Sequence, residues 1–281
     1  MIGRPVVRRL TADGLAIRAM SRDVERASRL LPSGCEIVRG DLRDLPSVEA
    51  AMRDCQAVYL NLAAPMRLRP PKWEPERDGT QAAIAAARRA GVMRIVRVSA
   101  LGVDDAADEW WAASHKSQAD HAVMESGLDG IILRPTWMME SLATFVLGGA
   151  IMRPNLRGAP LRWLAGDDLG RIASWALRAE FSQNRIVYAQ GPERIEFLEA
   201  IRRFAAAMPK RLRLVPVPIT PLRLMALISG KANYLVKLID MTERHFARLD
   251  ETPLEPDAPA ATMRIEDYVA YVQRTADVPR K

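Results

Sequence analysis

The stretch that decides the fold is GCEIVRGDLRDLPSVEAAMRDCQAVYLNLA, residues 34–63. It begins with a strand-like segment at 35–40 and passes through a Gly-Asp-Leu turn into a short helix at 46–54. A second apolar segment, AVYLNLA at 57–63, has the composition of a strand that is buried on both faces. Two strands joined by a helix form a βαβ unit, and such units build parallel sheets.

The same alternation extends on both sides of this unit. Further strands are predicted at 15–20, 93–100 and 129–135. Helices are predicted between the strands, at 4–12, 23–31, 74–90 and 112–126. The pattern therefore predicts an α/β fold with a doubly wound parallel sheet, whose ligand lies beyond the carboxyl ends of the strands.

After residue 140 the alternation weakens and helices dominate. Helices are predicted at 167–180, 194–208, 221–249 and 264–275, the third in two pieces around Gly230, with extended segments at 185–191 and 212–218. We expect one α/β domain over residues 1–140 and a smaller, mostly helical C-terminal lobe over 141–281. The 185–191 strand is a candidate to join the main sheet.

Composition excludes several classes of protein. The net charge is +7, but acidic residues accompany the basic ones, so specific nucleic-acid binding is not expected. The longest weakly charged stretch, 136–152, is too short for a membrane span, and a first helix explains MIGRPVVRRL better than a transit peptide does. Cys35 and Cys55 form neither a disulfide framework nor a metal cluster. We expect a cytoplasmic globular protein.

Several stretches match one known family in the right order. They are GRPVVRRLTADGLAIRAMSRD, the 34–63 stretch, RIVRVSALG, HKSQADHAVMESGLDGIILRPTWMME and GPERIEFLEAIRRFAAA. Together they resemble the NmrA-like and atypical, or extended, short-chain dehydrogenase/reductase proteins. The resemblance covers most of residues 3–208. It implies a Rossmann-like NAD(P)-binding domain at 1–140 and a substrate lobe after it.

The chain departs from this family at its front. Family members begin with a strand and a Gly-x-x-Gly-x-x-Gly turn, which lets the backbone approach the pyrophosphate of the dinucleotide. Only the last glycine has a counterpart here, Gly3, so the first strand is expected to be missing. Either the start codon is misplaced or the cofactor site is shortened. We expect weak or no NAD(P) binding by this form, and stronger binding by a form extended upstream.

The resemblance implies cofactor contacts at the strand ends. Arg22 follows the second family strand and would meet the 2′-phosphate of NADP, unless it is a solvated loop arginine, so NADP is expected over NAD. Asp41 and Leu42 would lie beside the adenine, or form a tight turn. At Asn61, Leu62 and Ala63, small residues at the end of the strand would let the dinucleotide pass close to the backbone. The alternative is that these residues only pack against their neighbours.

Three further residues are expected at the nicotinamide end of the cofactor. Lys116 matches the family lysine that binds the nicotinamide ribose, and Ser99 ends the fifth family strand. The family tyrosine one helical turn before the lysine is replaced by Ala112. His115 could substitute as the acid because imidazole titrates near neutrality, but a surface histidine is the favoured alternative.

Three functions are compatible with this sequence. The first is an NAD(P)H-dependent oxidoreductase acting on a small or apolar carbonyl compound. The second is a non-catalytic NAD(P)-sensing regulator or assembly factor, and the third is a scaffold that has lost cofactor binding. An apolar cluster near the expected mouth of the site would serve as a substrate pocket or as core: Trp110, Trp111, Trp137, Met138 and Met139.

Overall fold

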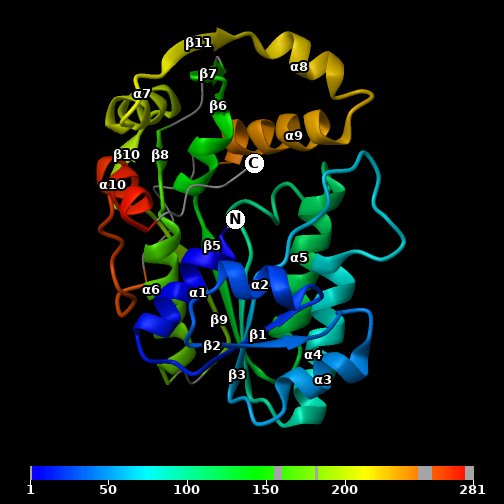
Figure 1. Ribbon diagram of the computed structural model, residues 1–281. Coiled ribbons are helices and arrows are strands. Elements are labelled where there is room, and N and C mark those ends of the chain that lie inside the picture. The colour runs from blue at the N-terminus through cyan, green and yellow to red at the C-terminus, as the bar shows by residue number, and fades with distance from the viewer. Residues whose placement is uncertain (1, 155–159, 181–182, 246–254, 276–281) are drawn as a thin grey trace.

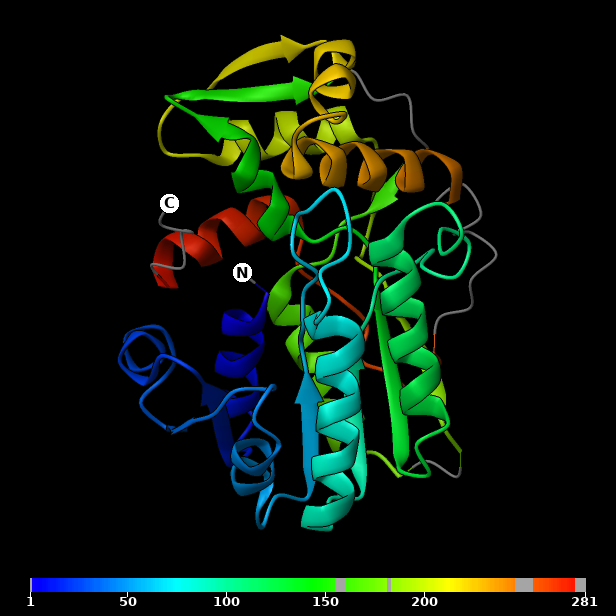
Figure 2. The same cartoon turned by 90° about the vertical axis from the view of Figure 1, so that its right-hand side faces the viewer.

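The computed structural model describes residues 2–154, 160–180, 183–245 and 255–275 (Figure 1). A larger α/β region holds the long parallel strands, and a smaller region of helices and short strands lies beyond one end of them (Figures 1 and 2). Segments from the second half of the chain return to the larger region before the chain ends in the smaller one. The two regions are therefore interleaved in sequence.

Helices and strands alternate through the first half as the sequence pattern predicts. Their bounds are α1 Gly3–Ala12, β1 Ile17–Ser21, α2 Val24–Leu30, β2 Cys35–Arg39, α3 Leu45–Met52, β3 Ala57–Leu60, α4 Thr80–Ala90, β4 Arg94–Val98, α5 Trp111–Met124 and β5 Asp129–Pro135. One difference is a π-helical turn, η1, at Pro75–Gly79, where a single helix from residue 74 is predicted. Local widening of this kind often marks a functional site.

The parallel strands of the larger region form two separate ladders. β3, β4, β5 and β9 (Arg185–Ala189) pair in that order, which confirms that the 185–191 segment joins the main sheet. β1 and β2 form a two-stranded parallel ladder of their own. Each of β1 and β3 thus keeps one edge without a ladder partner in the described part of the chain. The predicted fold class is confirmed, and the ladder is interrupted where the resemblance places the missing first strand.

Two helical layers cover the four-stranded ladder. α1 and α6 (Gly166–Arg178) pack on one face, over the fully buried Val96 and Ile131. α3, α4 and α5 cover the other face, over the fully buried Ile95 and Ile132. Successive strand residues point to opposite faces, so adjacent apolar residues build a core on each side. Each such burial contributes about 1.5–3 kcal/mol, which explains why these strands read as continuous apolar runs.

The smaller region combines short strands with four helices. Its elements are η2 Met139–Phe145, β6 Val146–Leu147, β7 Ala150–Pro154, β8 Leu161–Arg162, β10 Arg194–Ile195, α7 Phe197–Ala207, β11 Arg213–Val217, α8 Ile219–Met225, α9 Gly230–His245 and α10 Ile265–Thr275. β11 runs parallel to β7, and β6 runs antiparallel to it. The rings of Trp137, Trp163 and Phe197 form its core, with centroids 5.5–5.6 Å apart.

Neither a membrane-spanning helix nor a cluster of metal ligands occurs in the part of the chain that the structure describes. None of its helices has the length and apolar character needed to cross a bilayer. No group of three or more potential metal ligands occurs within it. Cys35 and Cys55 are both free thiols, and burial raises the pKa of the Cys35 thiol.

Candidate functional site

The start of α1 and the end of β3 meet at the carboxyl edge of the strands. A Cβ atom added to Gly3 would lie 3.5 Å from Nδ2 of Asn61. No side chain caps α1, and its first turn holds no acidic residue. The N–H groups of a first helical turn attract anions. Gly3 and Asn61, which were predicted from separate motifs, are therefore neighbours beside a helix end that suits a pyrophosphate.

Leu42 and Leu62 also come together, at the last residue of η1. A Cβ atom on Gly79 would lie 2.9 Å from Cδ1 of Leu42 and 3.5 Å from Cδ1 of Leu62. A larger residue at position 79 would force the Leu42 side chain to shift. Ala63 follows Leu62 and is exposed at the same edge. The predicted adenine contact Leu42 and the predicted backbone contact at 62–63 thus share one surface.

Asp41 shapes the turn after β2. Its carboxylate accepts a hydrogen bond from the backbone N–H of Arg43 at 3.0 Å, and its own N–H donates to Oγ of Ser47 at 3.0 Å. This is the tight-turn interpretation of Gly-Asp-Leu, in which an aspartate bonds the backbone two residues on. This turn sets the position of the next residue, Leu42.

The ends of β1 and β2 carry two arginines. Arg22 is exposed, and its carbonyl oxygen accepts a hydrogen bond from Nη1 of Arg39 at 3.2 Å. The neighbouring acid, Asp23, is engaged as the cap of α2 through the N–H of Arg26 at 2.9 Å. The Arg39 guanidinium therefore lies beside the backbone of Arg22, at the ladder end where the 2′-phosphate of NADP was predicted. Arg39 was not predicted; its place directly before Gly40-Asp41 was the available signal.

A buried chain of ion pairs crosses the face under α5. Arg97 on β4 is 1% exposed and pairs with Glu76 of η1 at 2.6 Å and with Asp120 of α5. Arg134 on β5 pairs with the same Asp120 at 2.9 Å and with Asp104 at 2.7 Å. Buried charges are retained only when they are paired. Sequence analysis missed this network, although arginines inside the apolar strands RIVRV and IILRP were its signal.

Ser99 belongs to this network. It is buried, and its hydroxyl donates a hydrogen bond to Oδ2 of Asp120 at 2.7 Å. The hydroxyl is thereby committed to the carboxylate that also holds Arg97 and Arg134.

Lys116 is joined to the other end of the network. Its Nζ forms an ion pair with Oε1 of Glu76, while Oε2 of Glu76 is held by Arg97. Burial lowers the pKa of Lys116, and the nearby Glu76 carboxylate only partly opposes this shift. Ala112, one helical turn earlier, is buried and supplies no hydroxyl. The amine is thus oriented by a carboxylate instead of by a neighbouring phenol.

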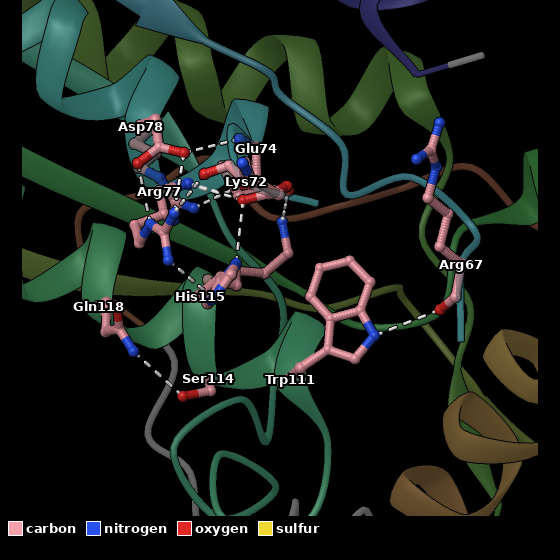
Figure 3. Close-up of polar contacts among 12 residues, drawn as sticks. Arg67, Lys72, Glu74, Arg77, Asp78, Trp111, Ser114, His115 and Gln118 are labelled. Carbon is pink, nitrogen blue, oxygen red and sulfur yellow. Dashed lines mark hydrogen bonds and ion pairs between the residues drawn. The ribbon is translucent and has the colours of Figure 1, made fainter. Parts of the chain in front are cut away.

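His115 lies between two charged side chains (Figure 3). One is Arg77 of η1, and the other is Glu74, the residue before η1. Nη1 of Arg77 is 3.2 Å from Nε2 of His115, and Oε2 of Glu74 is 3.4 Å from Nδ1. A guanidinium can only donate, so Nε2 accepts and the ring hydrogen lies on Nδ1, toward Glu74. His115 is buried and in edge contact with Trp111. It is therefore a buried, oriented ring and not a surface histidine.

Most of the apolar cluster expected at the mouth is core. Trp137 and Met139 pack in the core of the smaller region, and Met138 packs in the core under α1 and α6. Trp110 lies edge-on to Tyr234 of α9, with centroids 4.8 Å apart. Trp111 is the member beside the site, where its Nε1 donates to the carbonyl oxygen of Arg67 at 3.3 Å.

Residues 1–148 match a protein-family model described as NAD(P)H-binding. The chain belongs to this NAD(P)H-binding family. The match covers β1 to β5, the start of α1 and Lys116. The resemblance to NmrA-like and atypical short-chain dehydrogenase/reductase proteins is confirmed.

Two curated relatives of the chain are reductases by name. The chain is 27% identical to (4-alkanoyl-5-oxo-2,5-dihydrofuran-3-yl)methyl phosphate reductase of Streptomyces griseus, over 75% of this chain and 72% of that protein. It is 25% identical to NAD(P)H azoreductase of Xenophilus azovorans, over 77% and 73% respectively. The structure of an Escherichia coli NADPH-dependent quinone oxidoreductase shares the fold, with a TM-score of 0.74, 17% identity and 97% and 96% of the two chains covered.

Proposed function

We propose that the chain is an NADPH-dependent reductase of a small or apolar carbonyl compound. The observation that carries this proposal is the convergence of Gly3 with Asn61, and of Leu42 with Leu62, along one strand-end edge that leads to Lys116. Membership of the NAD(P)H-binding family and the reductase names of the relatives support it. In this proposal residues 1–140 bind the cofactor, and the smaller region shapes the substrate side.

The preference for NADPH is proposed from charge. Arg22 is the candidate ligand of the 2′-phosphate, and Arg39 is placed by its hydrogen bond to the Arg22 carbonyl to add a second positive charge. Guanidinium groups bind phosphate oxygens through several hydrogen bonds at once. An acid that would favour the ribose hydroxyls of NAD is not free, because Asp23 caps α2.

The residues present fit the nicotinamide half of the cofactor, which when bound supplies a hydride. Lys116 would donate to its ribose hydroxyls, and Glu76, held by Arg97, would aim the amine. His115 is the candidate to supply the proton as an imidazolium, whose charge the buried carboxylate of Glu74, 3.4 Å from Nδ1, would balance. Giving up the proton would leave the neutral ring that accepts from Arg77. A proton donor of this kind contributes about a hundredfold in rate.

A specific observation also favours a non-catalytic NAD(P)-sensing role. Ala112 supplies no hydroxyl, and the Ser99 hydroxyl is committed to Asp120. A site without a working acid would bind the cofactor and turn nothing over. The same experiment separates this alternative from the reductase.

The test combines calorimetric titration with NADPH and measurement of NADPH oxidation in the presence of a quinone, an azo dye and a small aldehyde. The reductase predicts turnover of at least one acceptor, a loss of about a hundredfold in His115→Gln, and weaker NADPH binding in Lys116→Met. His121→Gln on the same helix and Lys210→Met are the matched controls. Binding without turnover supports the sensor. Absence of binding contradicts both and leaves the scaffold.

A further inference from the structure

Two segments that are distant in sequence expose large apolar side chains at one end of the molecule. One is the loop after β3, and the other is the end of α8 with its turn into α9, at the right of the smaller region in Figure 1. Together they form what we call the apolar patch: Met66, Leu68, Leu224, Met225, Leu227 and Ile228. Leu227 is 75% exposed and Ile228 is 85% exposed. A cluster of this kind on a protein surface marks an interaction site.

The two segments are held together by tight backbone contacts. A Cβ atom on Gly230, at the start of α9, would lie 2.5 Å from the carbonyl oxygen of Met66, so only a glycine permits this approach. On the other side of the loop, Nε1 of Trp111 donates to the carbonyl oxygen of Arg67 at 3.3 Å (Figure 3). The exposed side chains of the loop and of the 224–228 turn are therefore presented by one packed unit.

The surroundings of the apolar patch are basic. No acidic residue occurs between Asp54 and Glu74, or between Glu199 and Asp240. The first stretch carries Arg67, Arg69 and Lys72, and the second carries Arg223 and Lys231 close to the patch. Of these cations, Arg223 pairs with Asp240 at 3.2 Å.

The remaining cations are available to a partner. Arg67, Arg69 and Lys231 are exposed and form no ion pair with a carboxylate of the described residues. Glu109, whose carbonyl oxygen accepts a hydrogen bond from Lys237 of α9, is engaged by Arg244 at 2.5 Å. The patch thus combines protruding apolar side chains with unneutralised positive charge.

We propose that the apolar patch docks the protein onto the surface of an anionic lipid bilayer. Leucine, isoleucine and methionine side chains insert at the boundary between headgroups and acyl chains, while arginine and lysine bind the negative headgroups. A second copy of the chain fits less well, because its own cations would face those of the first across the contact. This docking adds a membrane surface as partner and does not depend on the proposed reductase activity.

The test is co-sedimentation of the full chain with vesicles. Vesicles of phosphatidylcholine mixed with phosphatidylglycerol are expected to bind the protein, and those of phosphatidylcholine alone to bind it far less. High salt should release it, because screening weakens the headgroup contacts. Arg67→Gln and Lys231→Gln should each weaken binding by about fivefold. Arg26→Gln, an exposed arginine of α2, should leave binding unchanged.

The apolar contribution has its own variants and control. Leu227→Ser with Ile228→Ser should weaken binding by at least about tenfold, because both side chains would leave the acyl boundary. Met93→Ser is the control, since Met93 is 69% exposed at the start of β4. Unchanged melting temperatures establish that the variants fold. Equal binding to both kinds of vesicle, no binding, or a dimer in sedimentation velocity that the double variant dissolves would overturn the proposal.

Discussion

The two parallel ladders of the larger region differ in how deeply they are buried. In the four-stranded ladder the two central strands, β4 and β5, are buried from their second residue onward, with a core on each face. In the two-stranded ladder every residue of β1 is only half-buried, and a contact across it is the surface ion pair of Arg18 with Glu36 at 2.7 Å. The four-stranded ladder carries Arg97 and Arg134, whose ion-pair network reaches Lys116 of α5, while Arg22 directly follows β1 of the two-stranded ladder. In the proposed function, orientation of the cofactor and affinity for its phosphate would therefore depend on parts that differ in burial.

The largest effect is expected at Asp120 of α5, which pairs with two arginines of the four-stranded ladder. Asp120→Ala would leave Arg97 and Arg134 each short of a partner in a buried site, which should cost about 3–5 kcal/mol of unfolding free energy. Ser99→Ala is the control, because it removes one hydrogen bond to the same carboxylate and should cost about 1 kcal/mol. Urea denaturation measures both. Equal small losses would mean that the network does not hold this ladder.

The second effect concerns the interruption between the ladders. Fusing an apolar strand and a Gly-x-x-Gly turn ahead of α1 should pair the open edges of β1 and β3. The gain in unfolding free energy should be about 3 kcal/mol, from two or three backbone groups at about 1–3 kcal/mol each. NADPH affinity should rise as well, because the added turn offers N–H groups to the pyrophosphate. The control fusion replaces the strand by Gly-Ser repeats. Calorimetry showing equal NADPH affinity for both fusions would contradict the prediction.

The third effect lies in the two-stranded ladder. Arg22→Ala should weaken NADPH binding by about 1.5–3 kcal/mol, as expected for hydrogen bonds to a charged group, and should leave NADH binding unchanged. Arg26→Ala on α2 is the matched control. Parallel losses for the two cofactors would show that Arg22 supports the loop and does not bind the phosphate.

The smallest effect is a pH dependence at the outer end of the ion-pair network. Burial alone would raise the pKa of Asp104, but the hydrogen bonds from Ser117 and Arg134 outweigh it and lower the pKa below its usual value. A carboxyl whose pKa is lowered by folding stabilises the protein above the unfolded pKa of about 3.9 and loses this contribution as the pH falls. Asp104→Asn should therefore be less stable than the native chain at neutral pH, and the difference should shrink below about pH 4. A difference independent of pH would rule out this contribution.

Much of the fold could be predicted because its signals are local. The segments 35–40, 57–63 and 129–135 combine apolar composition with flanking turns, and each is a strand in the structure. The convergence of Gly3 with Asn61 followed from the rule that parallel strands end at one edge. The π-helical turn η1 could not be predicted, because proline and alternating charges read as the first turn of an ordinary helix.

The sequence by itself determined the order of strands and helices, the charge balance and the absence of a tyrosine before Lys116, because each is a property of neighbouring residues. Only the tertiary structure decided that Glu76, Arg97 and Asp120 would meet, since these residues lie on three different elements. It also decided that the loop after β3 would join the start of α9, where Gly230 meets Met66. The reason is physical: burial selects which distant charges must pair, and packing selects which apolar side chains remain outside.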